Sequence, residues 1–146
     1  MVDLGQAGES LVAAWLEQQG AKILQQRWRS PWGEIDLIAH FPATMMLAFV
    51  EVKTRSSGNW DQGGLLAVNG RKQEKLWQTA NHFLASRPQW ADLNCRFDVA
   101  IVFCLGDNNP TSHKEELPSS FKQGQTIIYH GYRLRLEQYL TNAFGG

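Results

Sequence analysis

The sequence of 146 residues has only two cysteines, Cys95 and Cys104, and both lie in or beside one apolar run. An extended strand between them would hold their sulfur atoms too far apart to bond. We therefore expect free thiols in a reducing cytosol rather than a disulfide framework. The four histidines are scattered and no CxxC or HxxxH spacing occurs. A zinc site built from cysteine and histidine is not expected.

Long apolar runs and an excess of one charge are also missing. No uncharged apolar run approaches the roughly 20 residues that span a bilayer, so we expect no membrane association. The N-terminal residues show no basic stretch ahead of an apolar one, so a signal peptide is not expected either. Fourteen basic and 14 acidic residues give a formal net charge of zero, which disfavours non-specific coating of nucleic acid. The composition predicts one cytoplasmic domain over residues 1–146.

Hydrophobic periodicity predicts an α/β sandwich around one mixed sheet, with a core over about 3–104. The first three strands have short connections, which favour an antiparallel meander. A glycine-rich loop over 56–70 separates them from the second helix, and a polar excursion covers about 105–124. The expected elements, in chain order, are a helix over 3–19, strands over 21–29, 34–40 and 45–53, a helix over 71–86, a strand over 96–104, a strand over 125–130 and a helix over 134–144.

Two carboxylates interrupt apolar strands. Asp36 lies within Gly33–Ile38 and Glu51 lies within Phe49–Lys53. A buried carboxylate is costly unless it is paired or bound to a metal. The strand period of two places Glu51 and Lys53 on one face. If the second and third strands are neighbours, Asp36 lies across from Glu51, and two carboxylates and an ammonium converge.

This convergence is typical of metal-assisted hydrolysis of phosphodiester bonds. Carboxylates hold Mg²⁺ while the ion keeps several waters, and the ion activates a bound water. Lys53 would position that water or offset developing charge, and Arg55 would hold the phosphate. Glu9 lies at the edge of the first helix's apolar stripe and could point at the sheet. Its place near the helix start is explained equally well by the helix dipole.

Four motifs together resemble the YraN-like proteins, the uncharacterised protein family 0102. They are Gly5-x-x-Gly8-Glu9, Gly33-Glu34-Ile35-Asp36-Leu37-Ile38, Phe49-Val50-Glu51-Val52-Lys53-Thr54-Arg55 and Arg96-Phe97-Asp98-Val99. These proteins are predicted endonucleases related to archaeal Holliday-junction resolvases, and the resemblance covers residues 5–104. It implies the restriction-endonuclease-like fold with a PD-(D/E)xK site. Asp36 would be the motif aspartate, although Ile35 replaces the proline, and Glu51 and Lys53 would be the E-x-K pair.

The same resemblance implies further roles. Glu9 would be the helix glutamate of the resolvase branch, and Lys72 or Gln73 would face the site. The strand with Asp98 would lie in the central sheet. Arg27 departs from the family, which usually has an asparagine there. Related resolvases act as dimers, but no dimer face is evident in this sequence.

The leading hypothesis is a nuclease that cuts DNA, including branched DNA, with Mg²⁺ or Mn²⁺ held by Asp36, Glu51 and the Val52 carbonyl. Catalysis would rest on Glu9, Asp36, Glu51 and Lys53. Contacts to nucleic acid are expected from Arg27, Arg29, Arg55, Lys72 and Gln73, with base stacking on Trp28, Trp32 or Trp60.

Structural and non-catalytic interpretations of the same residues remain open. The carboxylates could form a solvated hairpin face, and Asp98 could simply pair with Arg96. The protein could bind nucleic acid without cutting it, or it could be an adaptor for other proteins. The choice between DNA and RNA is also open.

The formal net charge of zero conceals a local excess of basic residues. Residues 21–75 hold eight basic and five acidic residues, a net charge of +3, and two of those acids are the proposed metal ligands. The sequence therefore predicts a localised, salt-sensitive contact with nucleic acid.

Overall fold

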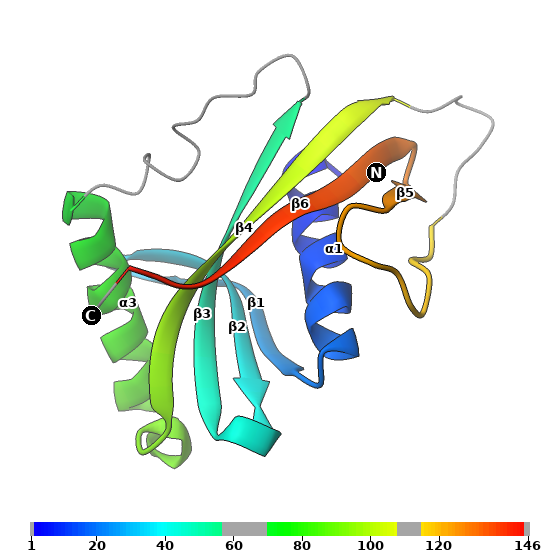
Figure 1. Ribbon diagram of the computed structural model, residues 1–146. Coiled ribbons are helices and arrows are strands. Elements are labelled where there is room, and N and C mark those ends of the chain that lie inside the picture. The colour runs from blue at the N-terminus through cyan, green and yellow to red at the C-terminus, as the bar shows by residue number, and fades with distance from the viewer. Residues whose placement is uncertain (1, 57–69, 108–114, 145–146) are drawn as a thin grey trace.

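A computed structural model describes residues 2–56, 70–107 and 115–144, which form two α-helices and one six-stranded mixed sheet (Figure 1). The strand order is β1-β2-β3-β4-β6-β5. The pairs β1–β2 and β2–β3 are antiparallel, β3–β4 is parallel, and β6 pairs antiparallel with both β4 and β5. The elements are α1 (Leu4–Gln18), β1 (Lys22–Ser30), β2 (Gly33–Phe41), η1 (Pro42–Thr44), β3 (Met46–Ser56), α3 (Gly70–Ser86), η3 (Pro88–Trp90), β4 (Asn94–Asp107), β5 (Thr126–Tyr129) and β6 (Tyr132–Phe144).

The two helices cover opposite faces of the sheet (Figure 1). Leu11, Val12 and Leu16 of α1 pack on one face, against strand residues such as Leu37 and Val50. Leu76, Ala80 and Phe83 of α3 pack on the other face, against residues such as Ile38 and Phe49. The alternation of Leu37 and Ile38 between the two cores is the two-residue period of a strand covered on both sides. The predicted mixed α/β arrangement and the antiparallel meander are confirmed.

Helix α1 begins where its sequence provides a cap. The Asp3 carboxylate accepts a hydrogen bond of 2.7 Å from the Gln6 backbone N–H, and the Gln6 side chain accepts one from the Asp3 N–H. This capping box satisfies backbone donors that the first turn leaves without partners. It fixes the start of α1 one turn before Glu9.

The predicted helix over 134–144 is wrong, because this segment is strand β6. Leu134 and Leu136 are buried and alternate with more exposed residues, which is the strand period. The two-residue turn between β5 and β6, His130 and Gly131, has φ values of 50° and 83°. Positive φ at both central residues is the geometry of a tight β-hairpin, and it joins β6 to β5 as neighbours.

The predicted polar excursion over 105–124 is also shorter than expected. Strand β4 continues to Asp107, beyond the predicted end at 104. Further on, Phe121 is buried, and its backbone N–H donates to the Gln18 side chain of α1 at 3.0 Å. The later part of the predicted excursion is therefore packed against the α1 face of the sheet. The predicted loop over 56–70 lies almost wholly outside the described residues.

Both cysteines lie on β4 and are free thiols, as predicted. Neither described α-helix combines the length and the apolarity that crossing a bilayer would require.

Candidate functional site

The candidate site lies where β2 and β3 separate. Their last paired residues are Leu37 and Val50, so Asp36 and Glu51 are the next residue on each strand. On β1, Gln26 and Trp28 pair with Leu37 and Ile35, which places Arg27 beside Asp36. Arg27 has a φ of 52°, a left-handed conformation that a non-glycine residue adopts only when its surroundings hold it there. An irregular backbone on β1 therefore coincides with the loss of pairing between β2 and β3.

The Asp36 carboxylate fills the opening between the two strands. Its Oδ2 accepts a hydrogen bond of 2.8 Å from the Val52 backbone N–H, a donor that lies beyond the last β2–β3 pair. Burial raises the pKa of Asp36 to about 7, and the neighbouring charge of Glu51 acts in the same direction. The Val52 hydrogen bond opposes this shift only in part. Near neutral pH, Asp36 is thus a carboxylate whose negative charge a cation would stabilise.

Glu51 is held by two lysines. Its Oε1 lies 3.1 Å from Lys53 Nζ and 3.5 Å from Lys72 Nζ. Lys53 is on the same face of β3, two residues on, whereas Lys72 comes from the first turns of α3. Burial lowers the pKa of Lys53, and the adjacent Lys72 lowers it further, while Glu51 raises it. The structure thus brings Asp36, Glu51, Lys53 and Lys72 into one cluster. The strand pattern predicts the approach of the first three, whereas Lys72 was expected near the site only from the family resemblance.

Glu9 is buried, but its nearest ionic partner is an arginine. Arg27 Nε donates to Glu9 Oε1 at 2.8 Å, and Arg27 also lies 3.6 Å from Asp3. Burial raises the pKa of Glu9 and the Arg27 hydrogen bond lowers it. A β-carbon at Gly8 would collide with the Thr54 side chain, so glycine allows α1 to approach β3 closely. This contact, which the residue types alone do not reveal, brings Glu9 to the edge of the cluster.

The other residues predicted to contact nucleic acid lie on β1, β3 and α3. Arg29 is exposed on β1 and pairs with Glu34 at 2.9 Å, and Arg55 donates to the Thr54 carbonyl at 3.2 Å. Gln73 is half-buried near the start of α3.

The tryptophans expected to stack bases differ in their surroundings. Trp28 packs edge-on against Phe83, so it contributes to the α3 core. Trp32 is 53% exposed at the turn between β1 and β2. Trp60 lies outside the described residues. Of the two tryptophans that the structure describes, Trp32 is thus the more exposed one.

Asp98 has a different environment from the cluster. It is fully buried and accepts hydrogen bonds from Arg96, from the Tyr139 hydroxyl at 2.6 Å and from the Asn142 backbone N–H at 2.9 Å. Burial and the nearby Asp98 charge raise the pKa of Tyr139. The interpretation of Asp98 as a partner for Arg96 is confirmed, and its further contacts fasten β6 to β4.

The cluster fits a divalent cation only in part. Within the described ranges, no group of three or more histidine, cysteine or acidic side chains is arranged to hold a metal ion. Two carboxylates do meet, and one of them has a raised pKa that a cation would lower again. Mg²⁺ commonly binds through one or two carboxylates and keeps its remaining waters. The donor set of Asp36, Glu51 and a nearby backbone carbonyl therefore suits such a hydrated ion.

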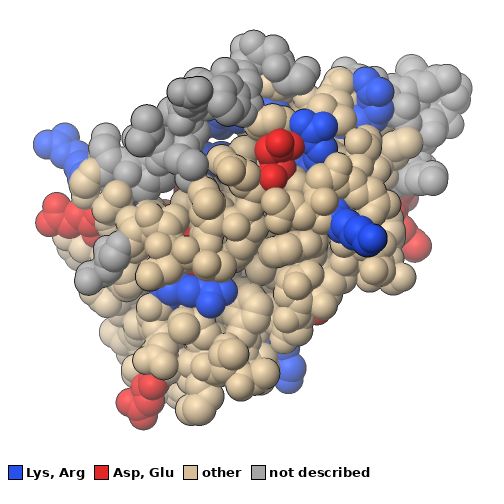
Figure 2. All heavy atoms as spheres, in the orientation of Figure 1, with Lys and Arg blue, Asp and Glu red and all other residues tan. Residues whose placement is uncertain are grey.

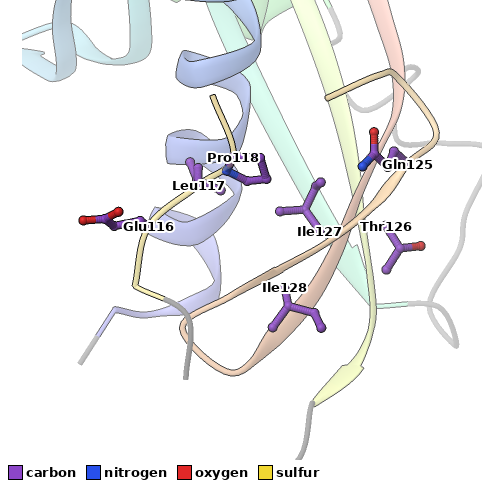
Figure 3. Close-up of a pocket in the computed structure, with 7 residues that line it drawn as sticks. All are labelled: Glu116, Leu117, Pro118, Gln125, Thr126, Ile127 and Ile128. Atoms are coloured by element: carbon purple, nitrogen blue, oxygen red, sulfur yellow. The ribbon is translucent and has the colours of Figure 1, made fainter. Parts of the chain in front are cut away.

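Two other surface features lie away from this cluster. A cavity of about 420 Å³ is lined by Glu116–Pro118 and by Gln125–Ile128 at the β5 edge (Figure 3). None of the clustered residues lines it. On the face where β4 and β6 lie in front, lysine and arginine side chains are scattered among uncharged ones (Figure 2). The described part of that face offers no continuous basic surface, in agreement with the balanced net charge.

The fold and this site define a mixed α/β protein that gathers two carboxylates and two lysines where neighbouring strands part. The model of the uncharacterised protein family UPF0102 matches residues 8–102, a range that contains the whole cluster. The chain belongs to this family. The cavity at β5 and the strand β6 lie beyond the matched range.

Three relatives illustrate the similarity. The UPF0102 protein sll0189 of Synechocystis sp. is 76% identical over the full length of both chains. A UPF0102 protein of Trichodesmium erythraeum is 44% identical over 98% of this chain and 89% of its own. The UPF0102 protein alr1796 of Nostoc sp. is 40% identical over 98% of this chain and 94% of its own. Similarity at this level extends beyond the matched range to nearly the whole chain.

Proposed function

We propose that this protein is a metal-dependent endonuclease that hydrolyses phosphodiester bonds in DNA, with branched DNA among its substrates. The observation that carries the proposal is the meeting of Asp36, Glu51 and Lys53 where β2 and β3 separate. Two carboxylates and an ammonium at an opening in a sheet are the groups that cation-assisted hydrolysis requires. The element order α1-β1-β2-β3-α3-β4, with β4 parallel to β3, agrees with a restriction-endonuclease-like arrangement, which we include in the proposal.

In this proposal Asp36, Glu51 and the Val52 carbonyl would hold Mg²⁺ or Mn²⁺. When bound, the cation would supply polarisation of the scissile phosphate and a lower pKa for a water molecule. The Lys53 ammonium, held beside Glu51, orients the attacking water and offsets the charge that develops on the phosphate. Glu9 supplements the site from α1 once Arg27 releases it, and Arg27, Arg29 and Arg55 contact the phosphate backbone.

A second candidate function is favoured by the ion pair between Glu9 and Arg27. This contact of 2.8 Å engages the third carboxylate with a protein cation and leaves two carboxylates for a metal. A protein with such a site could bind nucleic acid without cutting it. It would then bind DNA without a divalent cation, and binding would survive or improve in Glu51→Gln, since removing a negative charge lessens repulsion of phosphate.

The experiment that separates these functions is incubation of the protein with linear, flapped and four-way-branched DNA in Mg²⁺, in Mn²⁺ and in EDTA. The proposal expects cleavage that requires a cation and that is lost in Asp36→Ala and Lys53→Ala. Cleavage that is absent with both metals, or equal in the wild type and both variants, would exclude the nuclease. RNA substrates of the same shapes would establish whether the preference is for DNA.

A further inference from the structure

A single oxygen of Glu51 is shared by two ammonium groups from different parts of the fold. Glu51 Oε1 lies 3.1 Å from Lys53 Nζ and 3.5 Å from Lys72 Nζ. The Glu51 side chain is only 13% exposed, so these two cations supply much of its stabilisation. A carboxylate that binds a divalent cation has to present its oxygens to that ion. One of the two lysines therefore neutralises the Glu51 carboxylate that a divalent cation would otherwise bind.

The two lysines differ in how firmly they are held. Lys53 follows Glu51 on the same strand, and its side chain is 11% exposed. Lys72 belongs to α3, which is distant from β3 in the sequence, and its side chain is 39% exposed. A long, partly solvated lysine on a helix can rotate into water without moving the backbone. Lys72 is thus the ammonium that can leave Glu51.

The net charge of the cluster gives a reason for Lys72 to move away from Glu51 when a cation binds. With both carboxylates ionised, Asp36 and Glu51 balance Lys53 and Lys72, and the cluster is neutral. Entry of a divalent cation would add two positive charges beside two ammonium groups, an unfavourable arrangement at these distances. Rotation of Lys72 away from Glu51 removes one of them, and a DNA phosphate is the natural new partner for it.

We propose that Lys72 is an internal counter-ion that competes with the divalent cation for Glu51 and passes to a phosphate of the nucleic acid when the cation binds. This inference rests on the proposed function, because it concerns the same cation site. It assigns Lys72 a positioning role in addition to its expected contact with nucleic acid. Cation and DNA would then favour each other's binding, because the cation frees Lys72 to contact a phosphate and the phosphate keeps Lys72 away from Glu51; such coupling is reciprocal.

The test is calorimetric titration of the wild type and of Lys72→Met with MnCl₂ and MgCl₂, in the absence of DNA. Lys75→Met is the matched control, since Lys75 is exposed on the same helix and its loss changes the net charge equally. Removal of the competing ammonium should tighten cation binding about tenfold in Lys72→Met, relative to Lys75→Met. Equal affinities in the two variants would overturn the proposal, and so would weaker binding in Lys72→Met. Lys72→Gln provides a second test with a polar replacement, and circular dichroism establishes that each variant is folded.

Asp36→Asn separates failure of this inference from failure of the proposed function. If the wild type and Asp36→Asn show the same heat of cation binding, no cation binds at the cluster and both proposals fall. The second outcome is that the wild type binds the cation and Asp36→Asn does not, while Lys72→Met binds it no more tightly than Lys75→Met. In that case only the proposed role of Lys72 is contradicted. A second readout uses Ca²⁺ to support binding of branched DNA. Ca²⁺ should tighten DNA binding by wild type more than by Lys72→Met, and equal tightening would contradict the exchange of Lys72 from Glu51 to phosphate.

Discussion

The Asp36 carboxylate of β2 accepts a hydrogen bond of 2.8 Å from the backbone N–H of Val52 on β3, just beyond the last pair between the two strands. A side chain thus takes the place of the strand partner that Val52 would otherwise have. The same contact holds a carboxylate beside Glu51, whose charge disfavours ionisation of Asp36. The stability of the fold therefore favours a neutral Asp36, whereas cation binding requires an ionised one.

Replacement of Asp36 by asparagine should stabilise the protein at pH 8 without a divalent cation. The amide oxygen can still accept from Val52, while the buried negative charge next to Glu51 is removed. We expect a gain of about 1–2 kcal/mol and a melting temperature higher by about 3–6 °C. Thermal unfolding followed by circular dichroism measures this. Asp92→Asn, an exposed site, should change the melting temperature little, and a loss of stability in Asp36→Asn would contradict the account.

The raised pKa of Asp36 also predicts a pH dependence. Its pKa in the folded protein is about 7, above the ordinary value of 3.8, so folding takes up a proton between these values. The contribution of Asp36 to stability is fully present below about pH 4 and is lost as the pH rises through about 7. Without cation, the stability of the wild type should therefore fall relative to Asp36→Asn between pH 5 and pH 8.

Addition of Mg²⁺ should restore the stability that the wild type loses as the pH rises. Protons and the cation compete for Asp36, so Mg²⁺ should raise the melting temperature more at pH 8 than at pH 5.5. Differential scanning fluorimetry at several pH values measures both effects. A pH-independent Mg²⁺ effect, or a Mg²⁺ effect that persists in Asp36→Asn, would show that the ion binds elsewhere.

The close approach of α1 to β3 at Gly8 predicts a strong effect of a single methyl group. A β-carbon at Gly8 would collide with Thr54 Oγ, whereas at Gly5 the nearest atoms would be 3.5 Å and 3.7 Å away. Gly8→Ala should thus cost about 1–3 kcal/mol in the free energy of unfolding, as overpacking does. Gly5→Ala is the matched control in the same helix and should be neutral or stabilising. Urea denaturation measures both.

Thr54→Ala should restore much of the stability lost in Gly8→Ala, because it removes the oxygen that the new methyl group would meet. The two substitutions would then be strongly non-additive. If their effects simply add, the collision is not the reason why glycine is needed at position 8.

The Glu9–Arg27 pair should be worth far more than the Arg29–Glu34 pair. The side chains of Glu9 and Arg27 are 11% and 32% exposed, against 37% and 74% for Glu34 and Arg29. A double-mutant cycle of Glu9→Gln and Arg27→Met should give a coupling energy of about 1–3 kcal/mol. The same cycle at Glu34 and Arg29 should give less than about 0.5 kcal/mol. Similar coupling energies at the two pairs would contradict the interpretation that Arg27 holds Glu9 in place.

Much of the fold could be predicted because its inner strands are covered on both faces. Leu37 and Ile38, or Phe49 and Val50, are apolar neighbours on one strand that enter opposite cores, and such runs stand out in a sequence. Strand β6 could not be predicted in this way. Its apolar residues fit a helical stripe as well as a strand, and its pairing with β4 decided between the two. The turn at His130 and Gly131 was the local signal that was missed.

The candidate site was predictable where a charged residue interrupts an apolar strand, as Asp36 and Glu51 do. The contacts that govern its electrostatics were not. The pairing of Glu9 with Arg27 occurs together with a left-handed conformation at Arg27 in β1 and a close helix–strand contact at Gly8. The second lysine on Glu51 arrives from α3, which is distant in sequence. Such relationships depend on how the elements pack, and residue spacing along one strand does not reveal them.

The most direct test of the central claim is cleavage of a four-way-branched DNA by the wild type and by Glu51→Gln in Mn²⁺, with Asp92→Asn as the charge-matched control. Glu51→Gln keeps the size of the side chain and removes the charge on which the cation and Lys53 converge. The account predicts that the wild type and Asp92→Asn cut the DNA at equal rates and that Glu51→Gln is slower by roughly a hundredfold or more. Equal rates in all three proteins, or no cutting by the wild type, would contradict it.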